Sequence, residues 1–199
     1  MAGMSETDYP IAPVFEAYNR SVRDEDWRLR VVQLGSGVIG FTLPRSSGRR
    51  WGVSPRQREV LELRSEGLTN ARVATRLSLG EGSVKAHVSN LYLGLAADDI
   101  SEAYMKLAVL EQPSFTASAR DVPALLSRQL LLCTGVVLGM TNKQIGGFMK
   151  PGERPLREDT ISKELAEPFN KLGLTSRDQM AKRLLEPGIF VALPRGYEA

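Results

Sequence analysis

Residues 67–91, GLTNARVATRLSLGEGSVKAHVSNL, carry the strongest fold signal of this chain because they place two helix boundaries within one short stretch. Gly67 suits the left-handed position that ends a helix, and Thr69 suits the N-cap of the next one. A third helix begins after Gly80, and its apolar side chains recur on one face at helical spacing: Val84, Val88 and Leu91. The pattern therefore predicts consecutive helices joined by short turns.

The flanking segments complete a module of four helices. Upstream, Ser54 is a good N-cap, Pro55 suits the first helical position, and Gln57 closes a capping box. Downstream, Glu102 to Leu110 is compatible with a fourth helix. Residues 53–108 are therefore predicted to fold as a four-helix, helix-turn-helix module.

A second, damaged copy of this module is predicted over residues 124–185. The signature Gly67-Leu68-Thr69-Asn70 recurs as Gly139-Met140-Thr141-Asn142, and such self-similarity indicates a repeated structural unit. The expected fold is mainly α: two tandem four-helix helix-turn-helix domains with a small N-terminal extension that holds a short helix and a β-hairpin. The expected divisions are an extension with a basic linker (1–50), a first domain (51–111), a linker (112–123), a degenerate second domain (124–190) and a C-terminal tail (191–199).

Composition restricts the function classes. The net charge of +3 over 199 residues tolerates an anionic partner but does not require one. With one cysteine, Cys133, and one histidine, His87, the chain has neither an internal disulfide nor the ligands for a His/Cys zinc site. We find no signal-peptide pattern, and the longest apolar run, near 130–138, is too short to cross a bilayer. We expect a cytoplasmic, nucleoid-associated protein that needs no membrane, metal or cofactor.

The exposed side of the third helix has two interpretations. It carries a cation, an imidazole and small or short polar groups: Ser83, Lys85, Ala86, His87, Ser89 and Asn90. Small residues let a helix enter the major groove, and Lys, Ser and Asn can reach base edges or phosphates. The same residues also suit the solvated face of an ordinary helical bundle, and composition alone does not separate the two.

The pattern as a whole resembles the C-terminal DNA-binding domain of LuxR-type (NarL/FixJ-type) transcription regulators. The resemblance rests on signature residues at the family's spacing: Val53 to Leu61, Gly67 to Asn70, Val73-Ala74, Arg76-Leu77 and Ser83 to Leu91. It implies that the third helix enters the major groove and that bases are contacted by Lys85, Ala86 and Ser89. It also implies DNA-backbone contacts from Thr69, Asn70, Ser83 and His87. We add Asn90 to the DNA-binding set, and as auxiliary backbone contacts Arg49, Arg50 and Arg56.

Two segments depart from the family pattern. Gly80 stands where the family usually has a Ser N-cap, which costs about a few tenths of a kcal/mol. The turn before the fourth helix, Leu95 to Ile100, also differs, which puts the family's dimer role in doubt for this helix.

The second copy differs in the opposite way. Its first helix is far more apolar, with Leu130, Leu131 and Leu132 in place of Arg58, Glu59 and Val60, so we expect it to pack against another domain or subunit. The turn before its third helix is longer than in the first copy. That third helix is acidic, which opposes approach to phosphate, and it contains Pro168, which is expected to kink or end it.

The segment Phe169 to Ala181, in contrast, stays close to the family pattern for the dimer-forming fourth helix. We therefore predict a division of labour, in which the first copy reads DNA and the second offers a dimer or partner surface made of Leu130, Leu131, Leu172, Leu174 and Met180. Simple drift of a redundant copy is the alternative. In another alternative the insert is a wing-like loop that carries Arg154 and Arg157 to a phosphate.

Residues 1–50 match no sensor domain of the family and are too few for one. Pro13 to Arg20 suggests a short helix, while Trp27–Val31 and Val38–Leu43 suggest a hairpin turned by Gly35-Ser36-Gly37. A lone hairpin is marginal, so it should pack on the first repeat or on a partner protein. Pro44 to Arg50 is a basic linker that is either solvated or lies along DNA.

The function predicted from these patterns is that of a bacterial, sequence-specific regulator that binds double-stranded DNA, as a homodimer or with another regulatory protein. The alternative is an interaction adaptor that binds another regulator or RNA polymerase. An enzyme is not expected, because Cys133 lies in an apolar stretch and Gly146-Gly147 lacks the lysine of a phosphate-binding loop.

Overall fold

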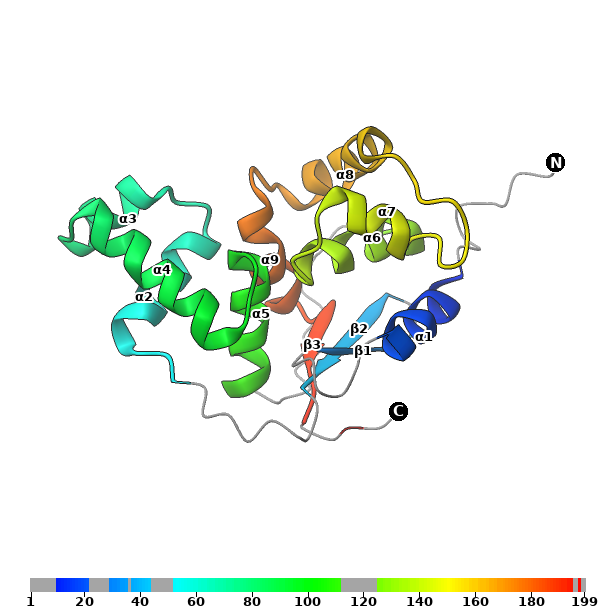
Figure 1. The fold of residues 1–199 in the computed structure, drawn as a ribbon, viewed down its shortest axis with the longest axis horizontal. Helices are drawn as coiled ribbons and strands as arrows, with labels where there is room; N and C mark the ends of the chain where they lie inside the picture. The colour runs from blue at the N-terminus through cyan, green and yellow to red at the C-terminus, as the bar shows by residue number, and fades with distance from the viewer. Residues whose placement is uncertain are drawn as a thin grey trace.

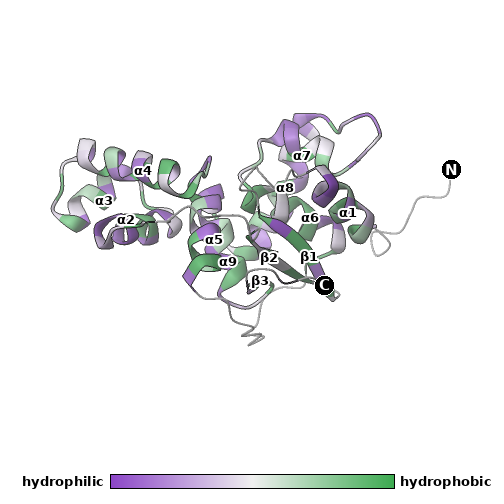
Figure 2. Cartoon of the chain, turned by 60° about the horizontal axis from the view of Figure 1, so that its bottom comes forward, coloured by the Kyte–Doolittle hydropathy of each residue, from purple (hydrophilic) through white to green (hydrophobic). Residues whose placement is uncertain are grey.

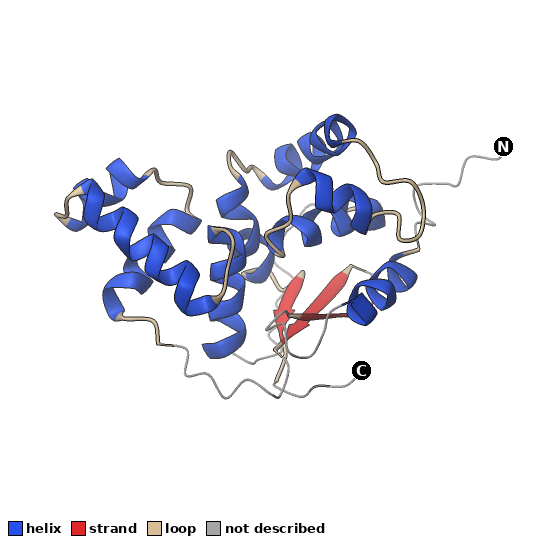
Figure 3. Cartoon of the chain, in the orientation of Figure 1, coloured by secondary structure: helices blue, strands red, loops and turns tan. Residues whose placement is uncertain are grey.

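The computed structural model describes residues 10–21, 29–35, 37–43, 52–111, 125–194 and 197, and its fold is mainly helical with one small sheet (Figures 1 and 3). The elements in chain order are α1 (Ile11–Ser21), β1 (Arg30–Gly35), β2 (Val38–Thr42), α2 (Pro55–Ser65), α3 (Asn70–Leu77), α4 (Glu81–Leu95), α5 (Ile100–Glu111), α6 (Ser127–Val137), α7 (Asn142–Phe148), α8 (Glu158–Leu172), the 3₁₀ helix η2 (Arg177–Gln179), α9 (Met180–Leu185) and β3 (Phe190–Ala192).

Local capping explains where the first group of helices, α2 to α4, begins. Gln57 N–H donates to Ser54 Oγ and Ser54 N–H to Gln57 Oε1, which is the predicted capping box. Thr69 Oγ1 accepts from the Arg72 amide at the start of α3, and Gly80 is the N-cap of α4. The core of this group is small. One cluster holds Val60, Val73, Ala74 and Val84; a second joins α2 and α4 to α5.

The later helices follow the earlier ones in the same order and at two fixed offsets in residue number. Both bounds of α6 and the start of α7 follow those of α2 and α3 by the same offset that separates Gly139 from Gly67. Both bounds of α8 and the start of η2 follow those of α4 and α5 by a second, larger offset. The offset grows because the turn between α7 and α8 is longer. Gly67 and Gly139, which precede α3 and α7, both have positive φ, at 87° and 70°.

Pro168 does not end its helix, which was one of the two outcomes expected from the sequence, because α8 continues to Leu172. Proline leaves the carbonyl of Glu164 without its helical partner, which costs about 3 kcal/mol in a helix interior. Burial on both sides of the proline offsets that cost, since Ile161, Leu165 and Leu172 all lie in the core beside α6. Tertiary packing therefore overrides the local preference.

The N-terminal extension contains the expected short helix and hairpin. β1 and β2 pair antiparallel with Val31 opposite Phe41, while Trp27, Arg28 and the basic linker lie outside the described residues. The sequence pattern did not predict β3, which pairs parallel to β2 with Ile39 beside Phe190. The hairpin therefore packs against the C-terminal end of the chain, and α1 contacts β1 and α6.

One large core joins this extension to α5 to α9. Figure 2 shows the apolar colour concentrated on the sheet and the helices around it. The most buried helix is α6, in which every residue from Gln129 to Val137 is buried. It contacts α1, α5, α7, α8 and α9, so the apolar residues predicted to pack on another domain are covered by the chain's own elements.

Candidate nucleic-acid interface

The exposed face of α4 presents most of the predicted DNA-binding residues together. Val84, Leu91 and Leu95 turn inward, and α4 contacts α2 and α3. The opposite side is exposed at Ser83, Lys85, Ala86, Ser89 and Asn90, whereas His87 is partly buried at the edge. Small or short polar groups around one lysine let this part of the helix approach a groove floor closely.

Lys85 is not committed to a stable internal contact. Its Nζ lies 3.0 Å from Glu81 Oε1 one turn earlier, and the two side chains are 63% and 50% exposed. Ion pairs this exposed contribute at most about 0.5 kcal/mol. A phosphate or base acceptor can therefore displace Glu81 at little cost.

The start of α3 holds the other predicted contacts, Thr69 and Asn70. Thr69 is exposed, and Asn70 is partly buried with an Oδ1 that has no hydrogen-bond partner within the described residues. In α7 the equivalent Asn142 is fully engaged, because its Oδ1 accepts from Arg177 at 2.9 Å and its Nδ2 donates to Ser162 at 2.8 Å. Asn70 Oδ1, in contrast, accepts no hydrogen bond from the described residues.

Two cations beside α4 were not predicted as contacts. Arg72 and Arg76 are exposed on α3, on the side away from the buried Val73 and Ala74. Their helical positions relative to the apolar face were a sufficient signal in the sequence. Together with Lys85 they give the α3–α4 surface a positive character that suits a polyanion.

Arg56, a predicted auxiliary contact, makes two contacts within the chain. Its guanidinium pairs with Glu59 at 2.6 Å and donates to the Leu77 carbonyl at 2.8 Å, which ties α2 to the end of α3. Arg49 and Arg50 lie outside the described residues.

The corresponding surface of α8 is acidic and partly occupied by internal contacts. Glu158 and Asp159 are exposed at its start. Glu164 accepts a two-point hydrogen bond from Arg128 at 2.8 and 2.9 Å. The preceding insert is anchored where the Leu156 amide donates to the Gly146 carbonyl at 3.2 Å, and Arg154 and Arg157 on it are exposed.

The residues predicted as a partner surface lie mainly inside the chain. Leu130, Leu131, Leu172 and Met180 are at most 2% exposed, and Leu174 is partly buried. They do not form an exposed surface in this structure. The segment predicted as the association helix, 169–181, is divided between the end of α8, the 3₁₀ helix η2 and the start of α9, and α9 packs on α5 of the same chain.

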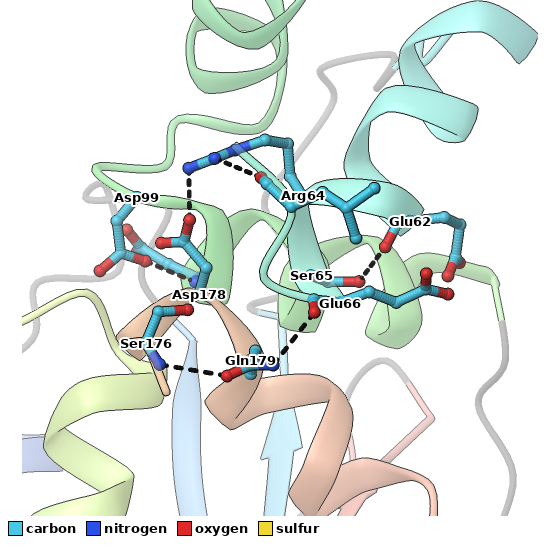
Figure 4. A network of polar contacts seen from close by, with 10 residues as sticks. Glu62, Arg64, Ser65, Glu66, Asp99, Ser176, Asp178 and Gln179 are labelled. Atoms are coloured by element: carbon cyan, nitrogen blue, oxygen red, sulfur yellow. Dashed lines mark hydrogen bonds and ion pairs between the residues drawn. The ribbon is translucent and has the colours of Figure 1, made fainter. Parts of the chain in front are cut away.

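Figure 4 shows the polar network that accompanies this packing. Arg64 pairs with Asp178, and Gln179 Nε2 donates to the Glu66 carbonyl at 3.0 Å. Lys182 Nζ lies 3.0 Å from Glu62 and 3.1 Å from Glu66. The residues come from α2 and its end on one side, and from η2 and α9 on the other.

Burial shifts the ionisation of these groups. It raises the pKa of Asp178, and the Arg64 charge opposes the shift. It raises the pKa of the neighbouring Asp99 to about 6, against the lowering effect of a hydrogen bond from the Glu102 amide. For Lys182 burial works to lower the pKa, but hydrogen bonds to Glu62 and Glu66 outweigh it and raise the pKa.

The single cysteine of the chain lies in the core rather than at a surface site. The Cys133 thiol is fully buried, and burial raises its pKa to about 12, so it is a poor nucleophile. Among these residues no group of three His, Cys, Asp or Glu side chains could hold a metal ion, and no helix is long and apolar enough to span a membrane.

Comparison with known proteins identifies the first helical group. Residues 52–107 match the model of the family described as bacterial regulatory proteins, luxR family. This range covers α2 to α4 and most of α5, and it ends before α6. No curated protein and no solved structure matches the chain. Residues 52–107 are therefore similar to the helix-turn-helix domain of the luxR family of bacterial regulatory proteins.

Proposed function

We propose that the protein is a bacterial, sequence-specific transcription regulator that reads the major groove of duplex DNA with α4. The observation that carries the proposal is the outward face of α4, with Lys85, Ala86 and Ser89 exposed within the segment that matches the LuxR-type family. Thr69, Asn70, Ser83 and His87 are proposed as backbone contacts, and Arg72 and Arg76 are added to them from their exposure.

We further propose that α6 to α9 are a degenerate second copy of the module, which does not read DNA. A copy is supported by the helix bounds, which recur at one offset for α6 and α7 and at a larger offset for α8 and η2. The loss of reading ability is supported by charge: Ser162 stands in place of Lys85, Glu164 in place of His87, and Glu158 and Asp159 precede them. Carboxylates at these places oppose the phosphate field of DNA.

A binding titration tests the first proposal. Fluorescence anisotropy with a selected duplex and with bulk DNA, at two salt concentrations, measures selectivity and the number of phosphate contacts. Lys85→Ala should weaken selective binding about 5- to 10-fold and, if Lys85 contacts a phosphate, reduce the salt slope by about 1. Lys163→Ala removes an exposed lysine from α8 and is the matched control, which should bind like the wild type.

Equal losses for the two lysine variants would indicate non-specific charge attraction and contradict a reading role for α4. A selected duplex that binds no better than bulk DNA would contradict sequence-specific regulation altogether.

The second candidate function is that of an adaptor for another regulator or RNA polymerase. The exposed acidic residues at the start of α8, beside the exposed insert, favour it as a surface for a basic partner. Glu158→Lys with Asp159→Lys should abolish capture of purified RNA polymerase and leave DNA binding intact. If the variant still captures polymerase, this surface is not the contact.

A further inference from the structure

We infer that the two modules pack on each other as the two halves of a dimer, so that one chain is a covalently joined pseudo-dimer that acts as a monomer with a single DNA-reading helix. The DNA part of this inference rests on the proposed DNA reading, and the packing part rests on the proposal that α6 to α9 are a second copy of the module. A twofold dimer uses an isologous interface, in which residue i of one half contacts residue j of the other and j contacts i. Reciprocal contacts between equivalent residues are therefore the criterion.

The two helix-ending glycines meet this criterion. Gln179 of the second module packs on Gly67 of the first, so closely that an added Cβ at Gly67 would lie 2.7 Å from Gln179 Nε2. Glu102 of the first module packs on Gly139 of the second, where an added Cβ would lie 2.7 Å from Glu102 Oε2. Gly139 is the equivalent of Gly67 at the offset that separates α6 from α2. Gln179 is the equivalent of Glu102 at the larger offset that separates α8 from α4. The same contact is thus made in both directions.

The two long side chains are also held in the same way by their own helices. Glu102 Oε2 accepts from the Asp98 amide at 2.7 Å, and Gln179 Oε1 accepts from the Thr175 amide at 2.8 Å. Thr175 is the equivalent of Asp98 at the second offset, so the two bonds correspond. Each side chain closes the turn before its helix with one oxygen and covers the glycine of the other module.

The contacts between whole helices are reciprocal as well. α2 contacts η2 and α9, and its equivalent α6 contacts α5. Between them α5 contacts α9 directly, so the fourth helices of the two modules form the centre of the interface, as Figure 1 shows. The Ala181 amide donates to the buried Ser101 Oγ across this centre at 3.0 Å.

Within the described part of the chain, this interface leaves no equivalent surface for a second copy. Ser101, Ala103, Met180 and Ala181 are all fully buried. Glu102, which is paired with the buried Lys106 at 2.7 Å, lies against Gly139 and would lose this cover if the modules separated. Opening the interface to exchange modules with another chain would expose this pair and the apolar core around it, which is unfavourable.

The consequence for DNA is an asymmetric complex. A homodimer of helix-turn-helix modules places two equal reading helices on an inverted repeat, with half-sites about one turn of DNA apart. Here the second position is held by α8, with Glu158 and Asp159 at its start. We expect one chain to bind one half-site, with no requirement for a mirrored second half.

The packing is tested without DNA. Sedimentation velocity at low concentration and light scattering at high concentration should both give the mass of one chain, 21.9 kDa. A stable dimer would overturn the inference. Lys182→Glu faces Glu62 and Glu66 and should lower the melting temperature, while Lys163→Glu, the same substitution on the exposed face of α8, should not. Equal melting of the two variants would show that the α2–α9 contact does not form in solution.

The DNA part is tested by selection from a random duplex library, followed by a stoichiometry titration. The expected motif is one non-palindromic block bound by one chain. An inverted repeat bound by two chains would overturn the inference while upholding DNA reading. If no motif is enriched, the proposed function and the single half-site both fail, and the mass and Lys182→Glu results still decide the pseudo-dimer.

Discussion

Substitution of Gly139 measures how tightly the two modules fit. Gly139 has φ 70°, and a Cβ there would lie 2.7 Å from Glu102 Oε2 and 3.3 Å from Glu102 Cβ and Cδ. Gly173, with φ 67°, has nothing within 4 Å of an added Cβ and is the matched control. Both Ala variants carry the backbone cost of a left-handed non-glycine residue, about 1 to 2 kcal/mol. Only Gly139→Ala also forces Glu102 to move.

The extra cost follows from the partners of Glu102. Moving its carboxylate strains the buried pair with Lys106 and the hydrogen bond from the Asp98 amide. Full loss of one partner of a buried pair costs about 3 to 5 kcal/mol, and partial displacement about half of that. Gly139→Ala should therefore unfold with about 2 kcal/mol less stability than Gly173→Ala. For a chain of this size that difference is about 4 to 8 °C in melting temperature.

Urea denaturation followed by circular dichroism gives the free energies, and calorimetry gives the melting temperatures. If the two variants unfold together, the close approach of Glu102 to Gly139 is absent in solution. Only the contact of Gln179 with Gly67 would then remain, and one contact without its reciprocal does not indicate twofold packing. Gly67→Ala should cost less than Gly139→Ala, because Gln179 is uncharged, whereas Glu102 belongs to a buried ion pair.

The interface and the core give three further expectations. Burial raises the pKa of Asp99 to about 6, so the stability that its protonated form contributes is present at low pH and is lost as pH rises through 6. Asp99→Asn should therefore stabilise the protein by about 2 kcal/mol at pH 7.5 and by almost nothing near pH 4. A difference in urea melts that does not depend on pH would contradict this. A double-mutant cycle of Arg64→Ala and Asp178→Ala should give a coupling energy of about 1 kcal/mol, against about 0.3 kcal/mol for the exposed pair Lys85 and Glu81; equal couplings would argue against a buried contact. Cys133 should react with a thiol reagent only as fast as the protein unfolds, and rapid labelling of native protein would show that α6 is not buried.

Much of the helical part of the fold could be predicted because its signals are local. Caps such as Ser54, Thr69 and Thr141 act on amides within the next three residues, and apolar spacing acts within one helix. The same holds for the exposed face of α4, which follows from the positions of Val84 and Leu91. Residues 52–107 match the luxR-family model, in agreement with the resemblance found in the sequence.

Other features could not be predicted from local signals. β3 is three residues long, and only its pairing with β2, near the other end of the chain, gives it strand structure. Arg56 looks like a free surface cation until Leu77 is found beside it. Leu130 and Leu131 were predicted to face a partner, because an apolar helix indicates that it is covered but not by which element.

The presence of a helix-turn-helix module, and the exposed face of its third helix, follow from the amino-acid sequence alone, since both depend on residues a few positions apart. Which element covers α9 is decided by the three-dimensional packing. Whether α9 packs on α5 of the same chain depends on side chains from separate modules, such as Glu102 against Gly139 and Gln179 against Gly67. Such contacts leave no periodic mark in the sequence, because shape and charge complementarity arise only once both helices have been placed.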